Sequence, residues 1–283
     1  MPSTAEKRRE FRRLHGSGCF VLPNPWDVGS ARYLQGLGFK AIASTSAGFA
    51  FTQGLPDGAV SRERLLTHLR ELSAAADIPL NADFEGGFAD DPDGVAESVR
   101  LCCATGVAGL SIEDSTGNPD HPLYDFDLSL KRVKAARAAI DKAGADVVFT
   151  ARSEGFIRNR PDLAETIQRL KAYAGAGADC LYAPGIKTRE EIEAIVAAVA
   201  PKPVNFLMAG AMPFSVIDLE RLGVRRISLG GTLARVAWTA VIRALSEIAS
   251  EGTFGKLGGG ISNAELNEFF RKDMKRRNPT DKT

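Results

Sequence analysis

Short apolar runs alternate with amphipathic segments along most of this chain. Eight strand-like runs begin at about Phe20, and they read FVLP, AIAST, PLNADF, GLSIED, VVFTAR, DCLYAP, PVNFL and RRISLG. The segments between them space apolar residues three and four positions apart, as in Leu65, Leu66, Leu69 and Leu72. This spacing gives each predicted helix one apolar face, so the pattern predicts eight β-α units.

A glycine precedes the approach to four of these runs, in LGFKAI, TGVAGL, AGADCL and LGVRRI. Each glycine is typical of a helix C-cap that leads into a strand. Eight units in about 250 residues suit a closed (β/α)8 barrel, whereas an open doubly wound sheet usually has fewer strands and a glycine-rich first turn. The first turn here, PNPWDVGS, lacks that glycine pattern. We therefore predict an α/β fold of the TIM-barrel class.

The pattern predicts a single domain over residues 1–283, with the barrel core at about 19–250. A short basic helix is expected over residues 5–14, and a long helix over 232–250 follows the eighth strand. A glycine-rich hinge and a further helix occupy 251–277, and residues 278–283 are expected to be disordered. A terminal helix reached through such a hinge can pack on its own barrel or be exchanged with a neighbouring subunit.

Composition narrows the class of partner. Lys and Arg number 36 against 35 acidic residues, so the net charge of +1 gives no reason to expect nucleic acid or a membrane surface. The four cysteines form no Cys-x-x-Cys pair, the first 20 residues lack a signal-peptide core, and no apolar run reaches membrane-helix length. We expect a cytoplasmic protein that acts on a small molecule.

Three acids are predicted to converge. If Leu80 to Glu85 is a strand, its alternation sends Asp83 and Glu85 to one face, and Glu113 ends the next apolar run. Carboxylates that lie this close together repel one another unless a cation or a proton lies between them. A cluster of oxygen ligands alone suits Mg2+ or Mn2+. The alternative is that these acids are solvated loop residues or helix caps.

Other polar residues also collect at the predicted strand ends, where barrel enzymes place their chemistry. Arg152 ends the fifth run, and its planar fork suits a carboxylate or enolate oxygen, although it can equally serve as an ion pair that balances the acids. The remaining candidates for substrate binding are Ser44, Thr45, Ser46 and Asn205.

With these residues assembled, the chain resembles the isocitrate lyase and phosphoenolpyruvate mutase superfamily from about Phe20 to Ile248. The resemblance rests on STSAGFAFTQGLPDG, NADFEGGFADDP, GLSIED and TARSEGF, in that order. It implies a (β/α)8 barrel, often tetrameric, whose last helix is exchanged between paired subunits. It also implies that the chain forms a homo-oligomer, either a dimer or a tetramer.

The resemblance implies roles for particular residues. Asp83, Glu85 and Glu113 match the acids that hold magnesium directly or through water, and Asp57 matches the acid of the family's GLPD motif. The carboxylate of a 2-oxo acid would be bound by loop amides together with Arg152, the loop residues being Ser44, Thr45 and Ser46. Asp57 would act as a base or orient metal-bound water, or would only cap the turn beside Gly58.

The chain departs from the family in the loop that selects the reaction. SIEDSTGNPDHPLYDF lacks the lysine and cysteine of the lyases and the loop of the mutases, and Pro184 replaces a polar residue after the sixth strand. His121 stands where the lyase cysteine would be, as a candidate general acid or base, or as an exposed loop histidine.

These observations lead to one main function and two alternatives. We expect a Mg2+-dependent lyase-type enzyme that cleaves a C–C bond of a 2-oxo or 2-hydroxy dicarboxylate through a pyruvate-like enolate. Oxaloacetate-like decarboxylation or hydrolysis and methylisocitrate-like cleavage both belong to this class. The alternatives are C–P bond chemistry on phosphonopyruvate, as a mutase or a hydrolase, and a non-catalytic 2-oxo acid binding protein.

Overall fold

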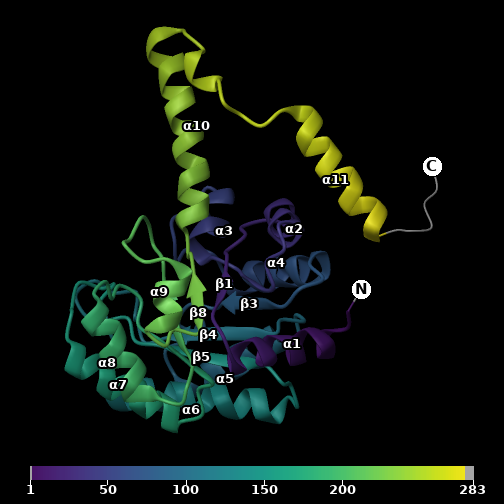
Figure 1. The fold of residues 1–283 in the computed structure, drawn as a ribbon. Helices are drawn as coiled ribbons and strands as arrows, with labels where there is room; N and C mark the ends of the chain where they lie inside the picture. The colour runs from purple at the N-terminus through teal and green to yellow at the C-terminus, as the bar shows by residue number, and fades with distance from the viewer. Residues whose placement is uncertain (1, 278–283) are drawn as a thin grey trace.

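The computed structural model of the protein describes residues 2–277 and contains eight parallel strands in one nearly closed sheet (Figure 1). Neighbouring strands follow the order β1-β8-β7-β6-β5-β4-β3-β2. The amide of Ala43 donates to the carbonyl oxygen of Pro23 over 3.0 Å, which links the ends of the first and second strands. The predicted eight-unit barrel is confirmed. The strands are β1 Phe20–Leu22, β2 Ile42–Ala43, β3 Leu80–Asp83, β4 Gly109–Glu113, β5 Val148–Arg152, β6 Cys180–Tyr182, β7 Val204–Leu207 and β8 Arg226–Ser228.

Helices alternate with the strands and surround the sheet (Figure 1). Their apolar faces pack against the outer face of the sheet, where Leu69, Val99 and Ile140 are fully buried. The predicted tail at 278–283 lies outside the described residues. The helices are α1 Thr4–Gly16, α2 Val28–Gly36, α3 Ser46–Thr52, α4 Arg62–Ala75, α5 Pro92–Cys103, α6 Phe126–Lys142, α7 Leu163–Gly175, α8 Arg189–Val199, α9 Val216–Arg221, α10 Thr232–Glu251 and α11 Asn263–Arg277.

The four repeated glycines end helices as predicted. Gly38, Gly106, Gly177 and Gly223 have φ angles of 91°, 89°, 97° and 87°. An L-residue with a side chain is strained in this left-handed region, whereas glycine is not. The repeated glycine therefore marks four helix-to-strand turns at which the backbone adopts a left-handed conformation.

The two C-terminal helices differ in how they pack. Figure 1 shows α10 rising away from the barrel, and its exposed apolar residues are Val236, Trp238, Val241, Ile242 and Leu245. The hinge contains a short 3-10 turn at Gly255–Leu257, and α11 then returns to α2. There the ring of Phe269 lies 4.6 Å from that of Tyr33. Within this chain α11 thus contacts α2 of its own barrel.

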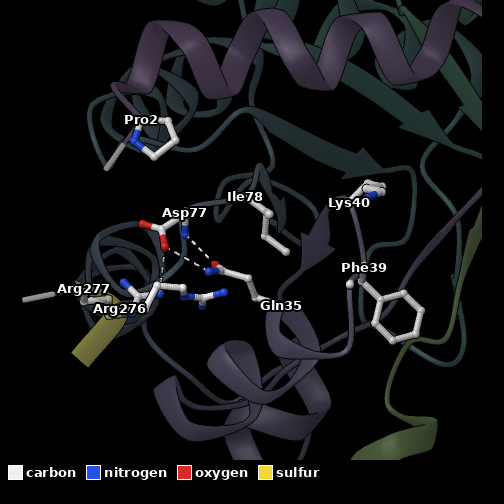
Figure 2. Close-up of a pocket in the computed structure, with 9 residues that line it drawn as sticks. Pro2, Gln35, Phe39, Lys40, Asp77, Ile78, Arg276 and Arg277 are labelled. Carbon is white, nitrogen blue, oxygen red and sulfur yellow. Dashed lines mark hydrogen bonds and ion pairs between the residues drawn. The ribbon is translucent and has the colours of Figure 1, made fainter. Parts of the chain in front are cut away.

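The arginine-rich end of α11 lines a pocket of about 450 Å3 together with Gln35 and Asp77 (Figure 2). Asp77 and Gln35 hold each other there, because Gln35 Nε2 donates to Asp77 Oδ2 over 2.9 Å and the Asp77 amide donates back to Gln35 Oε1 over 2.6 Å. Arg277 joins them through an ion pair of 3.3 Å to Asp77. These contacts anchor the terminal helix.

In the described part of the chain, no helix has both the length and the apolar character needed to cross a membrane.

Candidate active site

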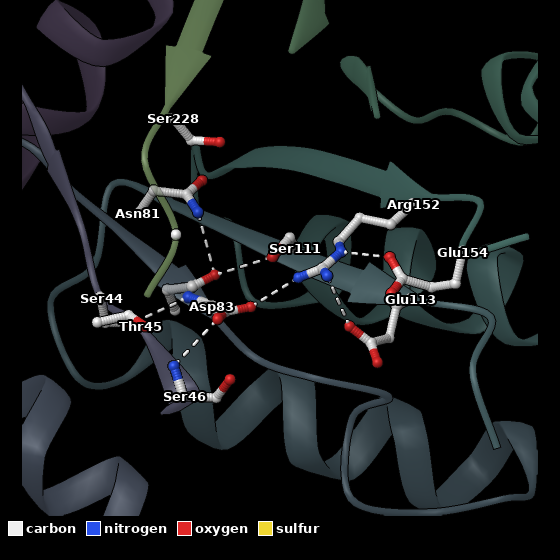
Figure 3. Close-up of polar contacts among 12 residues, drawn as sticks. Ser44, Thr45, Ser46, Asn81, Asp83, Ser111, Glu113, Arg152, Glu154 and Ser228 are labelled. Carbon is white, nitrogen blue, oxygen red and sulfur yellow. Dashed lines mark hydrogen bonds and ion pairs between the residues drawn. The ribbon is translucent and has the colours of Figure 1, made fainter. Parts of the chain in front are cut away.

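The guanidinium of Arg152 is the centre of the polar cluster at the C-terminal ends of the strands (Figure 3). Its Nη1 lies 2.8 Å from Asp83 Oδ1, its Nη2 lies 3.0 Å from Glu113 Oε2, and its Nε lies 2.9 Å from Glu154 Oε1. The side chain is only 13% exposed, so these ion pairs are shielded from water. Three adjacent strands, β3, β4 and β5, thus deliver three acids to one arginine.

Asp83 also ties the turn after β2 to the end of β3. Its Oδ2 accepts a hydrogen bond of 3.0 Å from the amide of Ser46, and its own amide donates to Ser44 Oγ over 2.9 Å. Thr45 caps α3, because Thr45 Oγ1 accepts from the amide of Gly48. The structure therefore brings all three predicted residues of this turn, Ser44, Thr45 and Ser46, beside Asp83.

Glu85 reaches the site by a different route from the one predicted. The strand ends at Asp83, not at Glu85, and Glu85 has a left-handed backbone with φ of 49°. The prediction of regular alternation up to Glu85 was wrong, because the chain turns into Gly86 and Gly87 before that position. The Glu85 carbonyl accepts from the amide of Glu113 over 3.0 Å, which fixes the turn.

The carboxyl group of Glu85 lacks the arginine partners of its neighbours. Burial raises its pKa to about 8, and the nearby charges of Asp83, Glu113 and Asp57 act in the same direction. No hydrogen bond or ion pair to this carboxyl is found among residues 2–277. The negative charge of the site is thus least compensated around Glu85.

Glu154 is the principal residue that sequence reasoning missed. Its side chain is 1% exposed, and it directly follows the strand that carries Arg152. Burial raises its pKa, and burial together with the charge of Glu154 raises the pKa of Glu113, while Arg152 opposes both shifts. The signal was present in TARSEGF, because residues two apart in an extended segment face the same side.

A buried network beneath the cluster holds Glu154 in place. Asp114 Oδ1 accepts from the amide of Glu154 over 2.8 Å, and Asp114 Oδ2 accepts from Tyr173 Oη over 2.8 Å and from Arg169 Nη1 over 3.2 Å. Arg132 donates to the carbonyl oxygens of Gly86, Ala89 and Asp90 in the turn after β3. Asp114 therefore holds the segment that carries Glu154, and Arg132 holds the turn that follows β3.

The acids and arginines line two adjoining cavities of about 670 Å3 and about 160 Å3. The larger is lined by five acids and two arginines, which gives an excess of negative charge. Four residues line both cavities: Ser46, Asp57, Arg152 and Ile157. Asp57 is exposed on the loop before α4. The acids of the larger cavity are Asp57, Glu85, Asp90, Glu113 and Glu154, and its arginines are Arg152 and Arg158.

Two predicted site residues lie outside both cavities. His121 is exposed on the loop between β4 and α6, and it is not among the described lining residues of either cavity. Asn205 is fully buried inside the barrel, where its Nδ2 donates to Ser228 Oγ over 2.9 Å and its Oδ1 accepts from Arg226 Nε over 2.7 Å. The structure brings neither side chain to Arg152.

The donors present suit a hard divalent cation in chemistry, since Asp83, Glu85 and Glu113 supply only carboxylate oxygens. Within residues 2–277, however, no three His, Cys, Asp or Glu side chains are arranged to hold an ion together. The reason is visible in Figure 3, where the guanidinium of Arg152 occupies the space between Asp83 and Glu113. Arg152 provides part of the positive charge that these acids require.

The fold and site define an α/β-barrel enzyme whose acidic centre lies at the C-terminal ends of its strands. A model of the phosphoenolpyruvate phosphomutase family matches residues 11–249, and the chain belongs to this family. Among solved structures, a Burkholderia cenocepacia protein assigned as a lyase or mutase shares 44% sequence identity with a TM-score of 0.90, covering 94% of this chain and 96% of that one.

Two further proteins bear on the class of enzyme. An oxaloacetate decarboxylase of Paraburkholderia xenovorans is 30% identical over 248 residues, which cover 84% of this chain and 76% of the relative. The structure of 2,3-dimethylmalate lyase, a member of the PEP mutase/isocitrate lyase superfamily, is 26% identical with a TM-score of 0.82, over 98% of each chain. The predicted superfamily is confirmed, and the chain is an enzyme of this lyase superfamily.

Proposed function

We propose that this enzyme cleaves a C–C bond of a 2-oxo or 2-hydroxy dicarboxylate next to a pyruvate-like enolate. The observation that supports this most strongly is the buried guanidinium of Arg152, held by Asp83, Glu113 and Glu154 at the base of an acidic cavity. Carboxylates orient its fork, and a fork of this kind recognises a substrate carboxylate in two hydrogen bonds.

The similar proteins support the same substrate class. Oxaloacetate is a four-carbon 2-oxo dicarboxylate, and 2,3-dimethylmalate is a 2-hydroxy dicarboxylate. Loss of carbon dioxide from oxaloacetate leaves negative charge on the carbon next to its 2-oxo group. Cleavage of the C2–C3 bond of 2,3-dimethylmalate turns the C2 hydroxyl into the carbonyl of a 2-oxo acid and leaves the charge on C3, next to the second carboxylate. In both reactions the charge is delocalised onto oxygen as an enolate. One arrangement of positive groups can therefore serve both reactions.

A magnesium ion would be held by Asp83, Glu85 and Glu113, directly or through water, with manganese as the alternative. When bound, the ion would stabilise the negative charge that develops on the substrate enolate. The carboxyl of Glu85 supports this assignment, because it has no ion-pair partner of its own among residues 2–277 and lies close enough to Asp83 and Glu113 to feel their charges. With Asp83 or Glu113 turned from Arg152, the fork would be open to the substrate carboxylate.

The chain's own groups would position the substrate and move its proton. The amides of the turn at Ser44, Thr45 and Ser46 would bind one carboxylate together with Arg152. Asp57 would accept or donate a proton, or orient a water molecule, and its position in the lining of both cavities supports this role. A role for His121 would require the loop between β4 and α6 to close over the larger cavity.

A magnesium-dependent turnover screen by proton and phosphorus NMR tests the proposal. Oxaloacetate, 2-methylmalate, methylisocitrate, isocitrate and phosphonopyruvate are offered separately, and consumption of a dicarboxylate with release of pyruvate or oxalate is expected. Turnover of phosphonopyruvate alone would replace the C–C reaction by C–P chemistry, the activity named in the description of the matching family. Magnesium-dependent binding of oxalate without any turnover would indicate a 2-oxo acid binding protein.

We further propose that the chain forms a homo-oligomer, a dimer or a tetramer. The exposed apolar face of α10 supports this, because a row of large apolar side chains on a projecting helix is stabilised when a second copy covers it. Light scattering tests the proposal, and Val241→Asp is expected to shift the protein toward the monomer. Exchange of α11 between subunits stays a prediction.

A further inference from the structure

A second arginine, Arg158, lines the larger cavity together with Arg152 and is the more exposed of the two. Arg158 belongs to the turn that follows β5, in which its amide donates to the carbonyl of Glu154 over 3.0 Å. The turn is fixed from outside by the loop after β6, because a Cβ atom at Gly185 would lie 2.8 Å from the amide nitrogen of Ile157. The position of Arg158 is therefore set by the barrel, even though its side chain reaches into the cavity mouth.

Arg158 shares its partners with Arg152 but contacts them more loosely. Its Nη2 lies 3.3 Å from Glu113 Oε1 and its Nε lies 3.9 Å from Glu154 Oε2, and its side chain is 43% exposed. The corresponding contacts of Arg152 are 3.0 Å and 2.9 Å, and that side chain is 13% exposed. Long, half-exposed ion pairs contribute little to stability, so Arg158 can exchange them for a new anion at low cost.

Glu113 and Glu154 each present one oxygen to each arginine. The two guanidinium groups consequently share the same pair of acids, and Arg152 is the more buried of the two. Among the described residues that line the larger cavity, these are the two basic side chains. An anion with two carboxylates can pair with both, whereas a monocarboxylate pairs with one.

We propose that Arg158 binds the second carboxylate of the substrate, the one carried on C3, and so selects dicarboxylates over monocarboxylic 2-oxo or 2-hydroxy acids. The inference rests on the proposed function, in which Arg152 and the turn at Ser46 take the first carboxylate. Arg158 is then a specificity-determining residue, and Glu113 and Glu154 hold it ready before the substrate arrives.

The test compares two acids that differ only in that carboxylate. Lactate and L-malate share the 2-hydroxy acid unit, and L-malate adds a carboxylate on C3. Each is titrated calorimetrically, with magnesium present, into the full-length protein and into the variants Arg158→Gln and Arg158→Lys. The matched control is Arg160→Gln, since Arg160 is exposed in the same turn and does not line the larger cavity. Thermal unfolding of each variant confirms that it is folded.

We expect Arg158→Gln to weaken L-malate binding at least about tenfold, as for a lost hydrogen bond to a charged group, and to leave lactate within about twofold. Arg158→Lys should recover part of the affinity for L-malate, and Arg160→Gln should change neither. If the wild type binds both acids and Arg158→Gln leaves both affinities unchanged, or weakens both equally, the role of Arg158 is overturned. The proposed function then still stands. A wild-type protein that binds L-malate no more tightly than lactate also overturns the role of Arg158, whereas the absence of dicarboxylate turnover in the NMR screen overturns the proposed function.

Discussion

Arg152 and Glu154 are joined by a hydrogen bond of 2.9 Å between Nε and Oε1, although they are only two residues apart at the end of β5. This contact fixes the plane of the guanidinium. Because Nε is directed at Glu154, the two Nη atoms point to Asp83 at the end of β3 and Glu113 at the end of β4. One local pair thus orients the arginine that the rest of the site is built around.

Two substitutions of Arg152 distinguish the contribution of its positive charge from that of its planar guanidinium group. Arg152→Lys keeps the charge but loses the fork, so we expect oxalate affinity to fall at least about tenfold in calorimetry. Arg152→Ala leaves three acids without their partner and is expected to cost about 3–5 kcal/mol in urea unfolding. Unchanged oxalate affinity in Arg152→Lys would assign Arg152 a purely structural role.

Asp83→Ala tests the metal assignment. We expect magnesium-dependent binding of oxalate to be lost while the barrel stays folded, because Asp83 would supply a carboxylate oxygen to the ion. Circular dichroism verifies the fold, and Asp93→Ala, an exposed acid on α5, serves as the control. If Asp83→Ala bound oxalate normally with magnesium, the ion would not be held as proposed.

Asp57→Asn and His121→Ala compare the two predicted proton-transfer groups. Asp57 lines both cavities, so we expect Asp57→Asn to lower kcat by roughly 100-fold at unchanged ligand affinity. His121 is exposed outside them, and we expect His121→Ala to keep kcat within about twofold. A large fall in kcat for His121→Ala, with binding retained, would instead show that its loop closes during the reaction. Turnover of the substrate found by NMR is the measurement.

Asp114→Ala should destabilise the protein strongly. The change leaves Arg169 as a buried charge without Asp114 and removes the acceptor of Tyr173 Oη and of the Glu154 amide. We expect a loss of about 3–5 kcal/mol in the free energy of unfolding. Asp120→Ala, in an exposed part of the same loop, should change it by less than about 0.5 kcal/mol. Equal losses in the two variants would refute a bracing role for Asp114.

His15 should make the protein sensitive to acid. Burial, and then the charge of Arg226, lowers the pKa of His15 to about 3, compared with about 6.5 in an unfolded chain. Between these values the unfolded chain binds a proton that the folded chain does not, so stability falls as the pH drops from about 6.5 toward about 3. The loss at pH 5 relative to pH 7.5 should be about 2 kcal/mol.

The variant His15→Gln isolates this effect, since it removes the titrating ring. Urea unfolding at pH 5 and pH 7.5 should show a smaller pH dependence in the variant than in the wild type, by about the same 2 kcal/mol. An identical pH dependence in both proteins would mean that His15 is not the responsible group.

The acidic end of the barrel could be predicted because strand ends are marked locally. Asp83, Glu113 and Arg152 each close an apolar run, and parallel strands in a barrel bring their C-terminal ends to one rim. The turn at Ser44, Thr45 and Ser46 was located for the same reason. Side-chain alternation extended the third strand too far, to Glu85, because it carries no information about where the backbone turns.

The sequence by itself determined the eight strands, the glycine-capped turns and the residues that reach the rim, since all of these follow from spacing along the chain. Only the tertiary structure decided that Arg158 joins the site, that Asn205 lies inside the barrel, and that His121 stays outside the cavities. The partners of Arg152 include Asp83, which is 69 positions away. Such contacts depend on how β3, β4 and β5 converge and on how their loops turn. Neither property produces a periodic pattern of residues, so neither can be recognised in the sequence.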